Sequence, residues 1–114
     1  MTVHAGAVDL KPHDLAEVVR LLQWLVPEFA VWAFGSRVKW TAKSYSDLDL
    51  AIITDVPLPL ARLAELKEAF DESSLPMRVD LVDWARTSES FRRIIQEQKI
   101  EIKPAATDDP RHSA

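Results

Sequence analysis

Two acidic residues two positions apart, Asp47 and Asp49, are the first candidates for chemistry in this sequence. Residues 48–54 (LDLAIIT) form an apolar, β-branched run that predicts a strand. Side chains alternate along a strand, so both carboxylates would project from one face, with their Cα atoms roughly 6.5–7 Å apart. Two like charges at that spacing repel unless a cation or water lies between them, and magnesium suits such oxygen ligands. Because a lone D-x-D pair also occurs at solvated strand ends, a metal site needs a second signal.

Gly35 and Ser36 supply that second signal, separated by ten residues from the acidic pair. The chain contains only two glycines, and Gly35 directly follows the run 29–34 (FAVWAF), which predicts a strand that ends in a turn. A glycine lets the backbone approach a ligand closely, and a turn from a strand into a helix directs N–H groups at an anion. With the Ser36 hydroxyl as a further donor, this turn is a candidate phosphate-binding site.

Alternating helices and strands would position these residues in one small α/β (α+β) domain, a mixed sheet flanked by helices. The pattern predicts a helix that starts at Pro12 and is closed by Pro27, a strand at 29–34, a short helix or turn at 36–42, a strand at 48–54, a helix at 60–70, a strand at 77–82, a helix at 88–98 capped by Ser88 or Thr87, and an edge strand at 100–103. We expect residues 1–11 to be a flexible lead-in, 12–103 the folded domain and 104–114 a disordered tail.

Composition excludes several classes of protein. A chain of 114 residues fits one domain with one core. Its net charge of −4 disfavours binding to long nucleic acid, although a short nucleotide held through metal ions remains compatible. The chain has no cysteine, which excludes disulfides and zinc–thiolate sites, and no apolar run approaches the roughly 20 residues that span a bilayer. Without a secretory signal, a cytoplasmic protein with no membrane contact is expected.

The combined pattern of Gly35, Ser36, Asp47 and Asp49 resembles a known family signature. The stretch 34–52 (FGSRVKWTAKSYSDLDLAI) is similar to that of the DNA polymerase β-like nucleotidyltransferase superfamily, and within it to the minimal nucleotidyltransferases. These small proteins are typically encoded beside a helical HEPN-type partner, and several act as antitoxins. The resemblance extends over residues 12–103, through the lead helix, the VWAFGSR strand end and the RVDLVDW and ESFRRII segments.

The resemblance implies a third carboxylate on a neighbouring strand. Asp80 matches it by position and lies within an apolar strand, where a solvated acid is not expected. Asp83, three residues later at the strand's end, is the rival, and we prefer Asp80. A salt bridge between Asp80 and a buried arginine is the structural alternative.

Cations and one aromatic ring lie close to the turn. Arg37, and less directly Lys39 and Lys43, could bind the phosphates, or they could simply be solvated. Of these we assign Arg37 to the nucleotide. Relatives often carry a glycine where this chain has Trp40, so the indole would reshape the turn or offer a stacking surface.

The resemblance implies a magnesium-dependent nucleotidyltransferase that moves AMP from ATP. Two Mg²⁺ ions held by Asp47, Asp49 and Asp80 would support in-line displacement at the α-phosphorus, with Gly35 and Ser36 securing the terminal phosphates. Larger relatives carry an additional domain that binds the acceptor, whereas here residues 12–103 account for the catalytic domain alone. The acceptor is therefore expected on another chain, a tyrosine hydroxyl of a HEPN-type toxin, in a homo- or hetero-oligomer.

Two alternatives stay open at this point. The first is a small-molecule enzyme that adenylylates an aminoglycoside-like acceptor with a partner subunit. The second is a non-catalytic antitoxin that only masks its toxin, which the clustered acids argue against because masking has no physical need for them.

Overall fold

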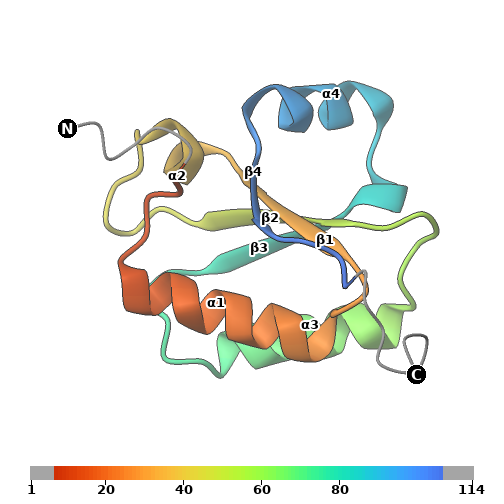
Figure 1. Ribbon diagram of the computed structural model, residues 1–114, viewed down its shortest axis with the longest axis horizontal. Coiled ribbons are helices and arrows are strands. Elements are labelled where there is room, and N and C mark those ends of the chain that lie inside the picture. The colour runs from red at the N-terminus through yellow and green to blue at the C-terminus, as the bar shows by residue number, and fades with distance from the viewer. Residues whose placement is uncertain (1–6, 107–114) are drawn as a thin grey trace.

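In the computed structural model, which describes residues 7–106, a four-stranded mixed sheet forms the centre of the molecule (Figure 1). Its strands are β1 (Ala30–Phe34), β2 (Leu48–Ile53), β3 (Val79–Asp83) and β4 (Ile100–Lys103), in the order β3-β2-β1-β4. Strand β1 runs antiparallel to both of its neighbours, and β2 and β3 are parallel. The mixed sheet expected from the sequence is therefore confirmed.

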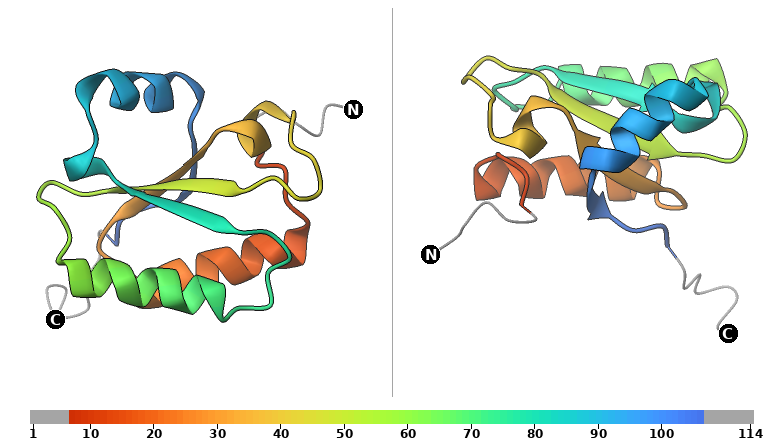
Figure 2. Two further views of the ribbon diagram at one scale, coloured as in Figure 1. Left: turned by 180° about the vertical axis from the view of Figure 1, so that it is seen from behind. Right: turned by 90° about the horizontal axis from the view of Figure 1, so that it is seen from above.

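Helices cover the two faces of the sheet unequally. They are α1 (Pro12–Leu25), α2 (Ser36–Lys39), α3 (Leu60–Asp71) and α4 (Glu89–Gln98), with a 3-10 turn, η1 (Trp84–Arg86), before α4. Figures 1 and 2 show α1 and α3 side by side against one face and α4 alone on the other. The main hydrophobic core lies between the sheet and the pair α1 and α3.

The alternation of side chains along β2 follows this arrangement. Leu48, Leu50 and Ile52 are fully buried in the main core, with Leu22 of α1 and Leu66 of α3 among its other members. The intervening positions point to the α4 side, where a smaller cluster forms around three buried residues, Phe34, Ala51 and Ile95. Asp49 belongs to this second face, so the core that anchors β2 also fixes the direction of its carboxylate.

The ends of the elements follow local signals. Helix α1 begins at Pro12, where a missing N–H costs nothing, and α4 begins after Ser88, whose hydroxyl accepts the Phe91 N–H. The third strand runs from Val79 to Asp83 and so begins two residues later, and ends one residue later, than the pattern predicted. No helix among residues 7–106 is long and apolar enough to cross a membrane.

The predicted lead-in is partly folded. Val8 is buried in the main core, and the Asp9 N–H donates to the Arg37 carbonyl at 2.7 Å. At the other end, the Ala106 N–H donates to the Pro27 carbonyl. The predictions for residues 1–6 and 107–114 lie outside the described residues.

Candidate active site

Three carboxylates meet where β2 and β3 lie side by side. Asp49 pairs in register with Asp80 on the parallel strand β3, so both side chains project from the α4 face of the sheet. Asp47 precedes β2 by one residue and adds a third negative charge. Within residues 7–106, none of these three side chains forms a hydrogen bond or an ion pair. The fold therefore brings the three predicted acids together and leaves their oxygens without a protein partner.

The pKa of Asp49 is raised by its surroundings. Partial burial, and then the negative charges of Asp80 and Asp47, raise the pKa of Asp49 from 3.8 to about 6. All three causes disfavour a charged carboxylate, and no neighbouring cation opposes them. A cation placed among these groups would reverse the effect.

Gly35 lies directly against this cluster. Its φ of +83° belongs to a region that glycine adopts without strain. A Cβ atom at this position would lie 2.3 Å from the Asp49 Oδ2 atom, a distance that real contacts do not allow. The sequence predicts a close approach of this glycine to a ligand, whereas in the structure Gly35 lies close to the Asp49 carboxylate. In addition, its N–H is bonded to the Gln98 Oε1 atom at 2.7 Å, so this predicted phosphate donor already has a partner.

The turn after Gly35 brings Ser36 into the same site. The Gly35 carbonyl accepts the N–H groups of Val38 and Lys39 and so starts α2. The Ser36 hydroxyl, by contrast, donates to no other group within residues 7–106. Trp40 ends this short helix with φ 61°, a left-handed conformation that favours glycine. Its indole N–H donates to the Ala7 carbonyl, so the ring is tied to the N-terminal segment.

Arg37 has a position that the sequence did not suggest. Its side chain is buried, and its guanidinium donates to the backbone carbonyls of Asp9, Lys43, Ser44 and Ser46 at 2.9–3.5 Å. These bonds fix the loop that leads into the acidic strand and leave little donor capacity for a phosphate. The sequence predicts that Arg37 binds the nucleotide, whereas in the structure its side chain supports the loop before Asp47.

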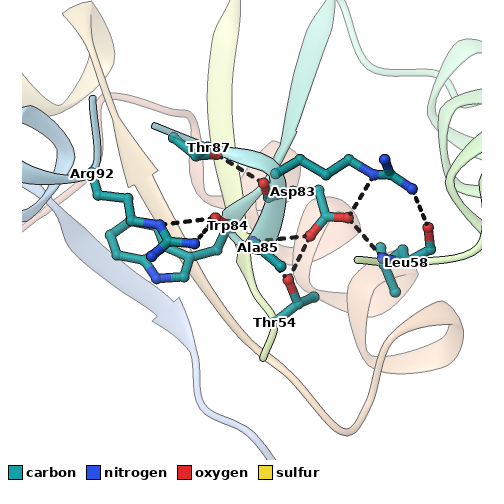
Figure 3. A network of polar contacts seen from close by, with 8 residues as sticks. Thr54, Leu58, Asp83, Trp84, Ala85, Thr87 and Arg92 are labelled. Carbon is teal, nitrogen blue, oxygen red and sulfur yellow. Dashed lines mark hydrogen bonds and ion pairs between the residues drawn. The ribbon is translucent and has the colours of Figure 1, made fainter. Parts of the chain in front are cut away.

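Asp83, the rival of Asp80, is bound on all sides by the protein (Figure 3). Its carboxylate is 5% exposed and accepts hydrogen bonds from the Thr54 hydroxyl and from the N–H groups of Leu58 and Ala85. The Arg86 guanidinium lies 3.4 Å away as an ion-pair partner. Every oxygen of Asp83 is therefore used in holding the end of β3 to the segment after β2.

The carboxylates of Asp47, Asp49 and Asp80 fit a hard divalent cation. Carboxylates are the ligands that Mg²⁺ accepts together with water and phosphate oxygens, and the mutual repulsion of these three favours a bound cation. No group of three or more acidic or histidine side chains among residues 7–106 is arranged so that it could hold a metal ion by itself. A substrate phosphate would have to complete the shell, as is usual for Mg²⁺.

Comparison with known proteins decides the family. The model of the family described as "Polymerase beta, Nucleotidyltransferase" matches residues 27–106, which include all three acids and the Gly35–Ser36 turn. The chain belongs to this nucleotidyltransferase family. It is 58% identical over 96 residues, 84% of each chain, to a probable protein adenylyltransferase, MntA, of Haemophilus influenzae.

Two solved structures share the fold of this nucleotidyltransferase. One is a toxin–antitoxin crystallised with AMP-PNP, with a TM-score of 0.68 and 26% identity, which covers 84% of this chain and 77% of that chain. Another is a tri-AMPylated Shewanella oneidensis HEPN toxin in complex with an MNT antitoxin, with a TM-score of 0.65 and 22% identity, which covers 89% and 78%. At that identity the second structure speaks for the fold alone.

Two contacts of the nucleotidyltransferase carry no signal in the sequence. One is the hydrogen bond that the Gly35 N–H donates to the Gln98 Oε1 atom, between residues 63 positions apart. The other involves Arg92, whose guanidinium donates to the Trp84 carbonyl and lies 5.2 Å from the centre of the Trp84 ring. Arg92 thus fastens α4 to η1 (Figure 3). Both contacts join segments that only the folded chain brings together.

Proposed function

We propose that this protein transfers AMP from ATP to a tyrosine hydroxyl of a HEPN-type helical toxin and thereby acts as its antitoxin. The observation that carries the proposal is the cluster of Asp47, Asp49 and Asp80. Asp49 and Asp80 are in register on neighbouring strands, and none of the three side chains has a hydrogen-bond or ion-pair partner among residues 7–106. A structural acid cluster would be neutralised from within, as Asp83 is. The name of the Haemophilus influenzae relative, a probable protein adenylyltransferase, supports a protein acceptor, and the toxin–antitoxin crystallised with AMP-PNP supports a toxin partner and an adenine nucleotide.

Each residue of the site has a role that follows from its place. Asp47, Asp49 and Asp80 would hold two Mg²⁺ ions, which neutralise phosphate charge and lower the pKa of the attacking hydroxyl when bound. Asp49 lies between the other two acids and would contribute to both ions. Ser36, next to Gly35, donates its hydroxyl to the terminal phosphates, and Gly35 keeps the turn close to the acids. Most of the rate enhancement then comes from positioning and charge neutralisation.

A partner chain is supported by the surface. Large apolar side chains contact solvent on three helices: Trp24 on α1 is 72% exposed, Leu60 on α3 71%, and Ile94 on α4 50%. Exposed apolar groups of this size commonly mark interaction sites. Trp24 and Leu60 lie on the face of α1 and α3, whereas Ile94 lies on the α4 side together with the carboxylates. A toxin docked on the α4 side would present its acceptor to these acids.

Labelled ATP tests the proposal. The protein is purified together with its candidate HEPN-type partner and incubated with Mg²⁺ and α-labelled ATP. We expect label on the partner, mapped by mass spectrometry to a tyrosine, and none when a chelator is present. Label on an antibiotic but not on the partner would favour the small-molecule reaction. Tight binding of the partner without any transfer would favour masking.

A further inference from the structure

The side chain of Gln98 reaches the Gly35–Ser36 turn from the end of α4. Its Oε1 atom accepts the Gly35 N–H at 2.7 Å in a partly buried contact. Gln98 is the last residue of α4, and the next strand, β4, pairs with β1 through Ile100 and Ala33. A helix and a strand pairing therefore both fix the amide beside the turn, so this bond is part of the framework.

Gly35 is consequently held at three points. Gln98 binds its N–H, the N–H groups of Val38 and Lys39 bind its carbonyl at 3.0 and 3.1 Å, and the Asp49 carboxylate lies against its Cα. Rotation of this peptide would move the Cα relative to the Asp49 oxygen. Because glycine has the widest conformational freedom of all residues, one defined conformation here needs an external anchor. Gln98 is the only side chain of residues 7–106 that binds the Gly35 N–H.

We propose that Gln98 is a positioning residue for nucleotidyl transfer, because its amide oxygen holds the Gly35 peptide and so keeps the Asp49 carboxylate in its working orientation. This inference rests on the proposed function and extends it to a residue outside the acidic motif. It also assigns the Gly35 N–H to the protein framework, so the phosphates would be bound through Ser36 and the cations.

The chain allows the anchor to be observed without any assay of activity. Since it contains only Gly6 and Gly35, labelling with ¹⁵N-glycine gives two amide signals, and Gly6→Ala identifies them. In Gln98→Met, which keeps the side-chain length but removes the acceptor, the Gly35 amide should exchange with solvent at least about tenfold faster. Gln96→Met is the matched control, since Gln96 is an exposed residue of the same helix. Equal Gly35 exchange in the native protein and Gln98→Met would refute the anchor.

Transfer kinetics then separate positioning from simple stability. At a temperature where all variants are folded, kcat of Gln98→Met should fall about 10- to 100-fold with little change in KM for ATP, because the misplaced acid acts in the transition state. Gln98→Glu still presents an acceptor at the same reach and should transfer faster than Gln98→Met. Gln96→Met should match the native protein.

Three results would overturn the inference. One is a kcat for Gln98→Met within twofold of the native value, which would leave the proposed function intact. Another is a Gln98→Met variant whose kcat is unchanged and whose KM for ATP is lower than that of the native protein. In this second case, the Gly35 amide signals of the native protein and of Gln98→Met would also become the same when Mg²⁺ and ATP are added. That pair would mean that the N–H binds phosphate and that Gln98 only competes for it. The third is the equal Gly35 exchange described above, which tests the anchor even if the native chain labels no partner and the proposed function fails.

Discussion

Asp80 and Asp83 lie three residues apart on β3, yet the protein surrounds their carboxylates in opposite ways. Asp83 is buried and bound by Thr54, by the Leu58 N–H and by Arg86, so its charge is neutralised within the fold. Asp80 is exposed, faces Asp49 across the strand pair, and has no protein partner among residues 7–106. A carboxylate that stabilises the fold is satisfied by the fold, whereas one that acts on a ligand is left to be satisfied by the ligand.

The same contrast distinguishes two basic residues that follow the Gly35–Ser36 turn. Arg37 is buried under backbone carbonyls and orders the loop before Asp47, although its place in the motif suggested a phosphate ligand. The exposed Lys39, two residues later, ends the short helix α2 and has no such contacts within the described part of the chain. Arg37 therefore supports the loop, although it lies closer to the Gly35–Ser36 turn in the sequence than Lys39 does.

Asp49→Asn should give the largest effect on transfer. Asp49 is the acid next to both other carboxylates and next to Gly35, so its loss removes a ligand from both proposed cations. Loss of several kcal/mol of transition-state stabilisation corresponds to a fall in rate of about a thousandfold or more. Labelled AMP transfer to the co-purified partner measures it, with circular dichroism to show that the variant is folded. Transfer within tenfold of the native rate would contradict a direct role for this acid.

Asp83→Asn should show the opposite pattern and reduce stability. The amide cannot reproduce the ion pair with Arg86, and it places an N–H₂ group against a backbone or hydroxyl donor. We expect a loss of about 2 to 4 kcal/mol in the free energy of unfolding, measured by urea denaturation. Asp55→Asn is the matched control, because Asp55 is exposed and should change stability by less than about 0.5 kcal/mol. Equal stabilities of the two variants would remove the structural role of Asp83.

Gly35→Ala should disturb the fold and the site together. The positive φ disfavours alanine, and its Cβ would collide with the Asp49 carboxylate. The strain should lower the free energy of unfolding by about 1 to 2 kcal/mol, and the displaced carboxylate should reduce transfer well beyond what the loss of folded protein explains. Urea denaturation and transfer at a temperature where the variant is folded separate the two effects. A drop in stability with unchanged transfer per folded molecule would show that Asp49 can shift without cost.

A smaller effect should appear in the pH dependence of stability. Because the pKa of Asp49 is raised to about 6 in the folded protein, the protonated form is favoured there. The penalty for the charged form is therefore absent below about pH 4, develops as the pH rises through about 6, and is complete above it. With a chelator present, Asp49→Asn should be more stable than the native protein by about 1 to 2 kcal/mol at about pH 8, and equally stable at about pH 4. No gain at the higher pH would show that the three acids do not repel one another.

The sequence predicts those parts of this site that depend on local spacing. Asp47 and Asp49 follow from strand alternation, and the mixed sheet follows from the hydrophobic pattern with only small shifts of its ends. Asp80 could be chosen over Asp83 by family resemblance, while the physical reason for that choice, the network around Asp83, is visible only in three dimensions.

The contacts that the sequence could not predict are long-range. Gln98 meets Gly35 because β4 returns along β1, and Val8 enters the core although it lies in a segment without periodicity. The burial of Arg37 depends on backbone carbonyls from two separate loops, and no pattern in the sequence predicts that these loops meet. In each case the missing information is the packing of segments far apart in the chain.

We propose that Asp80, and not Asp83, is the third catalytic acid beside Asp47 and Asp49. The direct test compares AMP transfer by Asp80→Asn and Asp83→Asn with the native rate, per folded molecule, at a temperature below the unfolding of both variants. Asp80→Asn should lose transfer by about two orders of magnitude or more, while ATP and Mg²⁺ still raise its melting temperature. Asp83→Asn should transfer at nearly the native rate. Normal transfer by Asp80→Asn together with an inactive but folded Asp83→Asn would contradict the claim.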